Sequence, residues 1–324
     1  MRRLFLICLL AVMAFCGMAQ RASAQSWPNR PVKVIAPFAA GGSADTLGRI
    51  ATDHLSKTFN QQFYVENRAG GGGLIGAKAV ALSEPDGYTF GISAIASHVI
   101  APVLSRTPPF DPLRDFTHVA YLGGPPFLLV VHPSLNVKTY KEFLALAKAS
   151  DKVINYVSSG AGTHGHLMAE YIARREGLRL NHVPYKGSAP AVMDLVAGQV
   201  LVGAMAWSSA VEQVRAGNLV AIGVAAENRI PDFPSVPTFK EAGYPDLVAA
   251  TWFALSAPAN LPADITAAVN REVNRMMDLP DVQKRMALEG VEIKKMTPEE
   301  FTALVAAEIA RYTPIAKTLG PPAD

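Results

Sequence analysis

The stretch VKVIAPFAAGGSAD, residues 32–45, predicts a strand, a turn of small residues and the start of a helix. Val32 to Phe38 is almost entirely apolar, which is typical of a strand that is covered on both faces. The apolar residues between Leu47 and Leu55 then recur with the spacing of one helical face. We interpret the stretch as a strand–turn–helix unit of an α/β fold.

The same alternation of short apolar runs and amphipathic stretches continues along the chain. Further strands are expected at residues 63–65, 88–92, 128–131, 153–157, 182–185, 200–206 and 220–225. Helices are expected at 77–82, 167–172 and 191–196, after Pro262, and after a capping box at 297–300. Residues 107–118 are rich in proline and aspartate, and we expect a loop there. This order predicts largely parallel sheets.

Residues 1–24 have the pattern of a secretory signal peptide. Arg2 and Arg3 form a basic start, residues 4–14 are apolar, and Ala22-Ser23-Ala24 is a small-x-small cleavage site. We therefore expect a periplasmic protein whose mature chain begins at Gln25. The two arginines leave twin-arginine export open as an alternative to ordinary secretion.

The charge and the cysteine content of the mature chain exclude several classes of protein. The whole chain has 30 Lys and Arg against 27 Asp and Glu, and Arg2, Arg3 and Arg21 supply all of the excess. A neutral mature chain lacks the basic surface that nucleic-acid binding requires. Cys8 and Cys16 both lie in the leader, so the mature chain has no disulfide and no zinc–thiolate site. About 300 residues often divide into two domains.

Two turns between a strand and a helix have the composition of an anion-binding site. We call Phe38 to Asp45 the first corner and Ser158 to His164 the second corner. Glycine lets a ligand approach the main chain. The first N–H groups of a helix have no internal partner and carry partial positive charge. Two such corners, in the two halves of a neutral exported chain, favour a cleft that binds an anion over two ordinary tight turns.

Three other motifs lack the residues that would complete them. Gly71 to Gly76 fits the dinucleotide pattern G-x-G-x-x-G, but residues 94–100, where an acid is expected, contain none. His164 and His166 supply only two metal ligands. No G-x-S-x-G nucleophile elbow is present. We therefore predict no catalytic residue, no cofactor and no metal.

Five segments together resemble one known family. They are Pro37-Phe38-x-x-Gly41-Gly42-x-x-Asp45, Glu66-Asn67-Arg68-x-Gly70-x-Gly72-Gly73-x-x-Gly76, Ser159-Gly160-x-Gly162-Thr163 with His166-Leu167, His182-Val183-Pro184-Tyr185-Lys186-Gly187, and Trp252-Phe253 with Ala257-Pro258. In this order they are similar to the signatures of the Bug family, the extracytoplasmic solute receptors of tripartite tricarboxylate transporters.

The resemblance implies a periplasmic-binding-protein fold of type II, with two Rossmann-like lobes that are joined by crossing strands and close like a Venus flytrap. Lobe 1 would hold residues 25–126 and 254–324, and lobe 2 residues 127–253. Main-chain groups of the two corners would hold a ligand carboxylate. The implied partners are the membrane components of the transporter, and we expect a monomer. Delivery to a membrane sensor protein and an exported hydrolase are the alternatives.

One departure from the family pattern bears on the ligand. Family members often carry aspartates shortly after Gly198-Gln199-Val200, where this chain has Leu201 and Met205. Without an acid, the cleft favours an ammonium group less and repels a second carboxylate less. Our hypothesis is a dicarboxylate or an acid with a neutral tail, and Trp207, Trp252 and Phe38 would suit an aromatic one such as terephthalate. The predicted ligand-binding residues are Phe38, Ala39, Gly41, Gly42, Ser43, Asp45, Ser97, His98, Ser159, Gly160, Ala161, Gly162, Thr163, His164, Tyr185, Met205 and Trp207.

Overall fold

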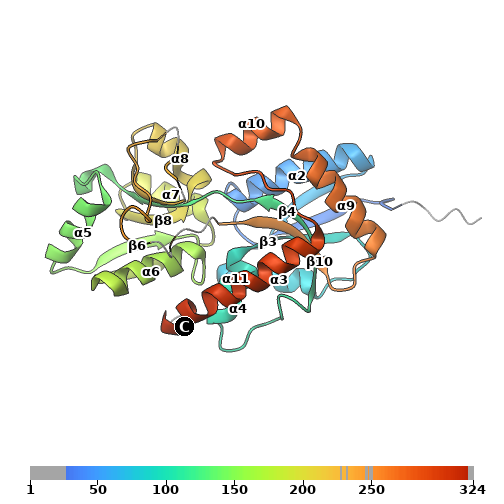
Figure 1. The fold of residues 1–324 in the computed structure, drawn as a ribbon, viewed down its shortest axis with the longest axis horizontal. Helices are drawn as coiled ribbons and strands as arrows, with labels where there is room; N and C mark the ends of the chain where they lie inside the picture. Colours follow the sequence, from blue (N-terminus) through green and yellow to red (C-terminus); the bar gives the residue numbers. More distant parts are fainter. Residues whose placement is uncertain (1–26, 227, 231–232, 245–246, 248–250, 320–324) are drawn as a thin grey trace, which may run out of the picture.

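The computed structural model describes residues 27–226, 228–230, 233–244, 247 and 251–319, so the expected signal peptide and its cleavage site lie outside the described residues. Two five-stranded sheets lie side by side, each with its own helices (Figure 1). Each sheet has its own apolar core. The prediction of a two-lobed α/β fold is confirmed.

The first sheet has the strand order β2-β1-β3-β10-β4. Its strands are β1 (Val32–Ala36), β2 (Phe63–Asn67), β3 (Thr89–Ala94), β4 (Phe116–Gly123) and β10 (Phe253–Pro258). Its helical segments are α2 (Ser43–Phe59), η1 (Gly71–Gly73), α3 (Leu74–Ala81), η2 (Ala96–Ile100), α4 (Ala101–Leu104), α9 (Ala263–Met276), α10 (Pro280–Leu288) and α11 (Pro298–Leu319).

The second sheet has the strand order β7-β6-β8-β5-β9. Its strands are β5 (Phe127–Val131), β6 (Ile154–Ser158), β7 (Leu180–Pro184), β8 (Val202–Ala206) and β9 (Val220–Ala225). Its helical segments are η3 (Pro133–Leu135), α5 (Tyr140–Ala149), α6 (His164–Glu176), α7 (Ser188–Val196) and α8 (Trp207–Arg215).

Both sheets are mixed: four strands of each run in one direction, in keeping with the prediction of largely parallel sheets, and one strand of each is antiparallel. Strand β10 is antiparallel to β3 and β4, and β5 is antiparallel to β8 and β9. These two strands enter their sheets directly from the segments that connect the two halves, and each runs against its neighbours. The remaining pairs among the described strands are parallel, as expected for βα units.

The prediction of a loop over residues 107–118 was wrong for its last three residues. Strand β4 begins at Phe116 and is mostly buried, but its start is hidden in the sequence by the preceding prolines and aspartates. The capping box before α11 is confirmed. The amide of Thr297 donates to Glu300 Oε2 at 2.8 Å, and the amide of Glu300 donates to Thr297 Oγ1 at 3.2 Å.

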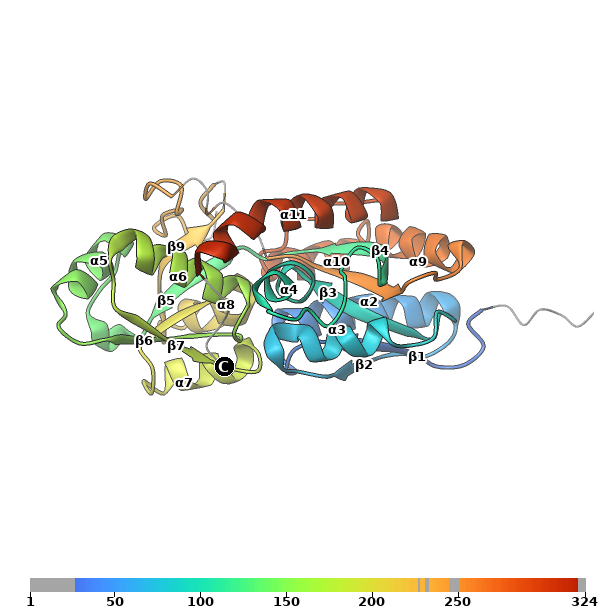
Figure 2. The same ribbon diagram turned by 90° about the horizontal axis from the view of Figure 1, so that it is seen from below.

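Helix α11 lies along both halves of the molecule (Figure 2). Its first turns pack on β4 and α9, and its later turns reach α6 beside the second sheet. Tyr312, which is 1% exposed, makes that last contact with its ring edge-on to His164. None of the helices in the described part of the chain has the length and apolar character to cross a membrane.

Candidate functional site

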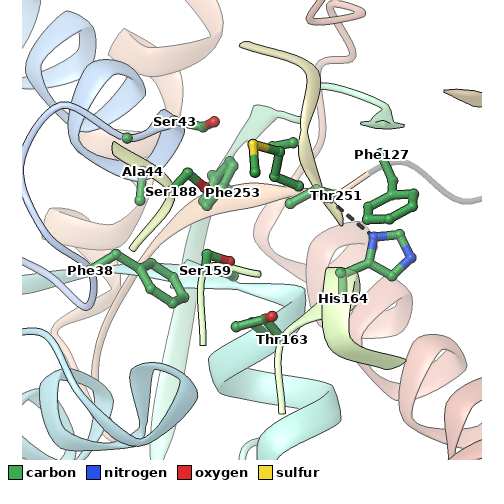
Figure 3. Close-up of a pocket in the computed structure, with 16 residues that line it drawn as sticks. Phe38, Ser43, Ala44, Phe127, Ser159, Thr163, His164, Ser188, Thr251 and Phe253 are labelled. Carbon is green, nitrogen blue, oxygen red and sulfur yellow. Dashed lines mark hydrogen bonds between the residues drawn. The ribbon is translucent and has the colours of Figure 1, made fainter. Parts of the chain in front are cut away.

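A small cavity of about 40 Å³ lies between the two sheets (Figure 3). By its volume it has room for about three water molecules. Both halves of the molecule line it, through the ends of strands and the starts of helices. The lining residues are Phe38, Gly42, Ser43, Ala44, Ala94, Ala96, Phe127, Ser159, Thr163, His164, Gly165, Ser188, Met205, Ala206, Thr251 and Phe253.

Four helices begin at this cavity, namely α2, α6, α7 and α8. Their N-cap residues are Gly42, Thr163, Gly187 and Ala206, and only Thr163 caps its helix with a side chain. The other three helices have no side-chain cap, so in α2 and α7 the first N–H groups lack a capping acceptor, whereas in α8 the amide of Trp207 donates to the carbonyl oxygen of Pro126 at 2.8 Å. Among the described residues, the lining includes no charged side chain. The positive potential in the cavity comes from the main chain, which suits an anion.

A charged group behind the cavity holds the first corner in shape. The Asp45 carboxylate is 5% exposed and accepts hydrogen bonds from Gly41 N at 3.1 Å, Arg49 Nε at 2.9 Å and Asn67 Nδ2 at 3.1 Å. Asn67 also donates to the carbonyl oxygen of Phe38 at 3.0 Å. Burial opposes ionisation of Asp45, but the hydrogen bonds from Arg49, Gly41 and Asn67 hold its pKa below the usual value. Asp45 therefore shapes the turn and does not line the cavity.

Neutral hydrogen bonds hold the second corner. Ser158 Oγ accepts from Gly160 N at 3.1 Å and lies 2.7 Å from His182 Nε2. Thr163 Oγ1 donates to the Gly160 carbonyl oxygen at 2.7 Å, and it also caps α6. Gly162 has a φ of +72°, which other residues rarely adopt. Its amide donates to His166 Nδ1 at 3.1 Å.

His164 connects the cavity to α11. Its Nδ1 lies 3.2 Å from Thr251 Oγ1, and its Nε2 lies 3.4 Å from the Tyr312 hydroxyl. Burial, together with the charge of Arg311, lowers the pKa of His164 to about 3, so the ring is neutral at pH 7. His164 and His166 thus have different partners, and no group of three metal-ligating side chains is found among the described residues.

The two halves touch around the cavity. Ser43 Oγ on α2 lies 2.5 Å from Ser208 Oγ and 3.1 Å from Ser209 Oγ on α8. The amide of Ala39 donates to the carbonyl oxygen of Lys186 at 3.0 Å. The glycine-rich turn η1 packs closely against the second corner. A Cβ added to Gly72 would lie only 2.3 Å from the Ala161 carbonyl oxygen. Only glycine permits this approach.

Of the residues predicted to bind ligand, some line the cavity and others lie behind it. The lining members are Phe38, Gly42, Ser43, Ser159, Thr163, His164 and Met205. Ala39, Gly41, Asp45, Gly160, Ala161 and Gly162 belong to the same two corners but do not appear in the lining.

Four further predicted residues have other contacts. Ser97 and His98 are buried in η2, where Ser97 Oγ accepts from Ala94 N at 3.2 Å and lies 3.0 Å from His98 Nδ1. The Tyr185 hydroxyl donates to Asp194. Trp207 packs edge-on against Phe233. None of the four contributes to the cavity lining.

Sequence reasoning missed several lining residues, of which Ser188 is the most informative. Ser188 is 8% exposed, and its hydroxyl, like that of Ser159, has no hydrogen-bond partner among the described residues. Gly187-Ser188 follows β7 and begins α7, so it is a third corner of the same composition. That signal was available in the sequence. Thr251 and Phe253 have no local signal, because they reach the cavity from the crossing segment.

Comparison with known proteins agrees with this architecture. Residues 47–320 match the family described as "Tripartite tricarboxylate transporter family receptor". BugT of Bordetella pertussis is 36% identical over 309 residues, which are 95% of this chain and 94% of that protein.

Two solved structures are similar over nearly their whole length. The R. palustris protein Rpa4515 with adipate has a TM-score of 0.86 at 34% identity and covers 90% of this chain and 98% of its own. MatC (Rpa3494) from Rhodopseudomonas palustris with bound malate has a TM-score of 0.85 at 33% identity and covers 90% of this chain and 100% of its own. With its two α/β lobes and a family match over most of its length, this chain belongs to the Bug-type receptors of the tripartite tricarboxylate transporter family, which are periplasmic solute-binding proteins.

Proposed function

We propose that this protein captures a small aliphatic dicarboxylate between its lobes and delivers it to the membrane components of a tripartite tricarboxylate transporter. The observation that carries the proposal is the convergence of four helix N-termini on a cavity without a charged side chain in its described lining. Each helix N-terminus is equivalent to about half a positive charge. Four of them therefore match about two negative charges.

The lobes proposed for this capture are residues 25–126 with 254–324, and residues 127–253. The strands of each sheet fall within one of these two sets, except that Phe253, the first residue of β10, lies one residue before the boundary. Ligand would enter when the lobes separate. It would be enclosed when they close again near the contact of Ser43 with Ser208 and Ser209, with the cavity widened beyond its present volume of about 40 Å³. The mature protein would act in the periplasm after cleavage behind Ala24.

Polar and apolar groups in the lining suit different parts of such a ligand. The free hydroxyls of Ser159 and Ser188, with the main-chain amides of the corners, would receive carboxylate oxygens. Phe38, Phe127 and Phe253 would contact a methylene chain. The Rpa4515 and MatC structures contain adipate and malate, which are aliphatic dicarboxylates.

An aromatic acid has less support than an aliphatic one. Trp207 packs against Phe233, and Trp252 packs against Phe301, so neither of these rings is available for stacking on a ligand. An amino acid is also disfavoured, because Met205 lines the cavity and no described lining residue offers a carboxylate to an ammonium group.

Thermal unfolding of residues 25–324 tests this function. The protein is freed of carried-over ligand by unfolding and refolding, and it is then titrated with succinate, malate, adipate, terephthalate and aspartate. A ligand at about 100 times its Kd should stabilise the protein by about 2.7 kcal/mol. We expect this shift with the aliphatic dicarboxylates. Ser188→Ala should weaken their affinity about threefold to tenfold without changing the melting temperature of the free protein. Stabilisation by aspartate alone, or by none of the acids, would contradict the proposal.

Delivery to a transporter needs a separate test in cells. Deletion of the gene should abolish uptake of the radiolabelled acid that binds in vitro, and the Ser188→Ala gene should restore uptake only at raised substrate concentration. Unchanged uptake in the deletion strain would favour a sensor over a transport receptor.

A further inference from the structure

A stacked pair of histidines lies directly behind the second corner. The rings of His166 on α6 and His182 on β7 have centroids 4.1 Å apart and are inclined by 17°. The ring of Tyr156 on β6 also stacks on His182, at 5.0 Å and 27°. Neither histidine lines the cavity. Both instead contact the residues that shape the second corner.

The role of one ring nitrogen follows from its partner. The amide of Gly162 donates to His166 Nδ1 at 3.1 Å. A main-chain amide is always a donor, so Nδ1 must be without a proton and the neutral ring must carry its proton on Nε2. Gly162 is buried, and loss of this acceptor would therefore leave its amide unsatisfied.

The surroundings of the pair favour neutral rings. Burial lowers the pKa of His166, and the carboxylate of Glu170 on the same helix opposes this only in part. Burial, and then the neighbouring His166, lower the pKa of His182 to about 3. The titratable groups that face the pair are Glu170 from α6 and Tyr156 from β6, and Glu170 Oε1 accepts a hydrogen bond from the Tyr156 hydroxyl at 2.8 Å. Glu170 is therefore already engaged at the edge of the stack.

We propose that neutral His166 is the positioning residue of the second corner, and that protonation of the His166–His182 stack displaces this corner and weakens ligand binding in acid. A proton on Nδ1 would face the Gly162 N–H, and the charged His166 ring would lie stacked 4.1 Å from the buried ring of His182. The displaced segment carries Ser159 and the N-terminus of α6. The predicted effect of His166 on ligand affinity rests on the proposed function. The predicted effect of His166 on the Gly162 amide does not.

Two substitutions at one position separate hydrogen bonding from packing. His166→Asn keeps an acceptor near the place of Nδ1, whereas His166→Leu keeps bulk and removes the acceptor. We expect His166→Leu to raise the Kd for the bound dicarboxylate about tenfold to hundredfold at pH 7.5, and His166→Asn to stay within about threefold of the wild type. His132→Asn is the matched control, because His132 Nδ1 also accepts a main-chain amide, that of Ser134, at a turn away from the cavity.

The acid effect is measured as the ratio of Kd values for wild type and His166→Asn from pH 7.5 to pH 4.5. Protonation of the ligand affects both proteins equally and cancels in the ratio. We expect the wild type to lose affinity relative to His166→Asn as the pH falls, by up to about tenfold per pH unit once His166 titrates. The wild type and His132→Asn should lose affinity in parallel.

A readout without ligand keeps the inference independent of the proposed function. NMR of isotope-labelled protein should show the Nε2–H tautomer of His166 in the wild type. The Gly162 amide should be protected from exchange in the wild type and in His166→Asn, but not in His166→Leu. If no carboxylate binds the wild type, the proposed function fails and this readout still decides the role of His166. An unprotected Gly162 amide in the wild type, equal affinities of the Leu and Asn variants, or a Kd ratio independent of pH would overturn the inference.

Discussion

The two corners have similar sequences and opposite means of support. The first corner is held by ionised Asp45, which binds Arg49, Asn67 and the amide of Gly41. The second corner is held by the hydroxyls of Ser158 and Thr163 and by the neutral ring of His166. The small residues of a turn at a helix start therefore predict that an anion can approach it. They do not predict which interactions hold the turn in place. Whether a corner is held by a charged or by neutral groups decides the pH at which it loses its native conformation.

The largest loss of ligand affinity is expected from a substitution at Gly72, where the first half of the molecule contacts the second corner. Gly71 and Gly72 both have positive φ, at +58° and +63°. A Cβ on Gly72 would lie 2.3 Å from the Ala161 carbonyl oxygen, whereas a Cβ on Gly71 would come no closer than 3.6 Å to Leu74 Cβ. Gly72→Ala should lower ligand affinity about hundredfold, because both strain and the clash oppose closure.

Gly71→Ala is the control for this prediction, since it introduces similar strain of about 1 kcal/mol without the clash. Its affinity should remain within about threefold of the wild type. Isothermal titration calorimetry gives the two affinities, and equal losses would show that the contact between Gly72 and the second corner does not limit closure.

A smaller difference is expected in the response of the two corners to acid. The pKa of His164 is lowered to about 3, so between pH 6.5 and that value the unfolded chain binds a proton that the native protein does not. Stability therefore falls as the pH falls, by up to about 1.4 kcal/mol per pH unit from this residue. The pKa of Asp45 is lowered from 3.8, so its contribution is present above pH 3.8 and is lost only below it.

Urea unfolding at pH 7, 6 and 5 measures this difference. His164→Gln should reduce the loss of unfolding free energy between pH 7 and pH 5, while Asp45→Asn should lower stability by a constant amount over the same range. If the two variants showed the same pH slope, the neutral support of the second corner would not be the source of its acid sensitivity.

The smallest losses of affinity and stability are expected when one hydroxyl is removed from each corner. Thr163→Ala removes both the cap of α6 and the bond to the Gly160 carbonyl oxygen, so it should cost about 1 kcal/mol of stability as well as affinity. Ser43→Ala removes only the contacts to Ser208 and Ser209, so it should weaken ligand binding about threefold and leave the melting temperature unchanged. Calorimetry and thermal melts of both variants check this, and a lower melting temperature for Ser43→Ala would contradict it.

Sequence patterns predicted most strands and the position of both corners, because these depend on local periodicity and on residues within one turn. They did not predict that one strand of each sheet is antiparallel, because β5 and β10 obtain their orientation from the segments that cross between the halves. They also placed Ser97, His98 and Trp207 at the ligand. In the structure these side chains are at most 2% exposed and contact other parts of the protein.

The sequence by itself determined where main-chain N–H groups are left without partners, because glycine, serine and threonine at a helix start act within a few residues. It also determined that residues 25–324 carry 27 basic and 27 acidic side chains and no cysteine. Only the tertiary structure decided that four of these helix starts meet at one cavity, and that Ser188 and Thr251 join them while Trp207 does not. The physical reason is that a shared cavity depends on how two separately folded sheets pack across their crossing strands, and that packing involves residues far apart in the chain.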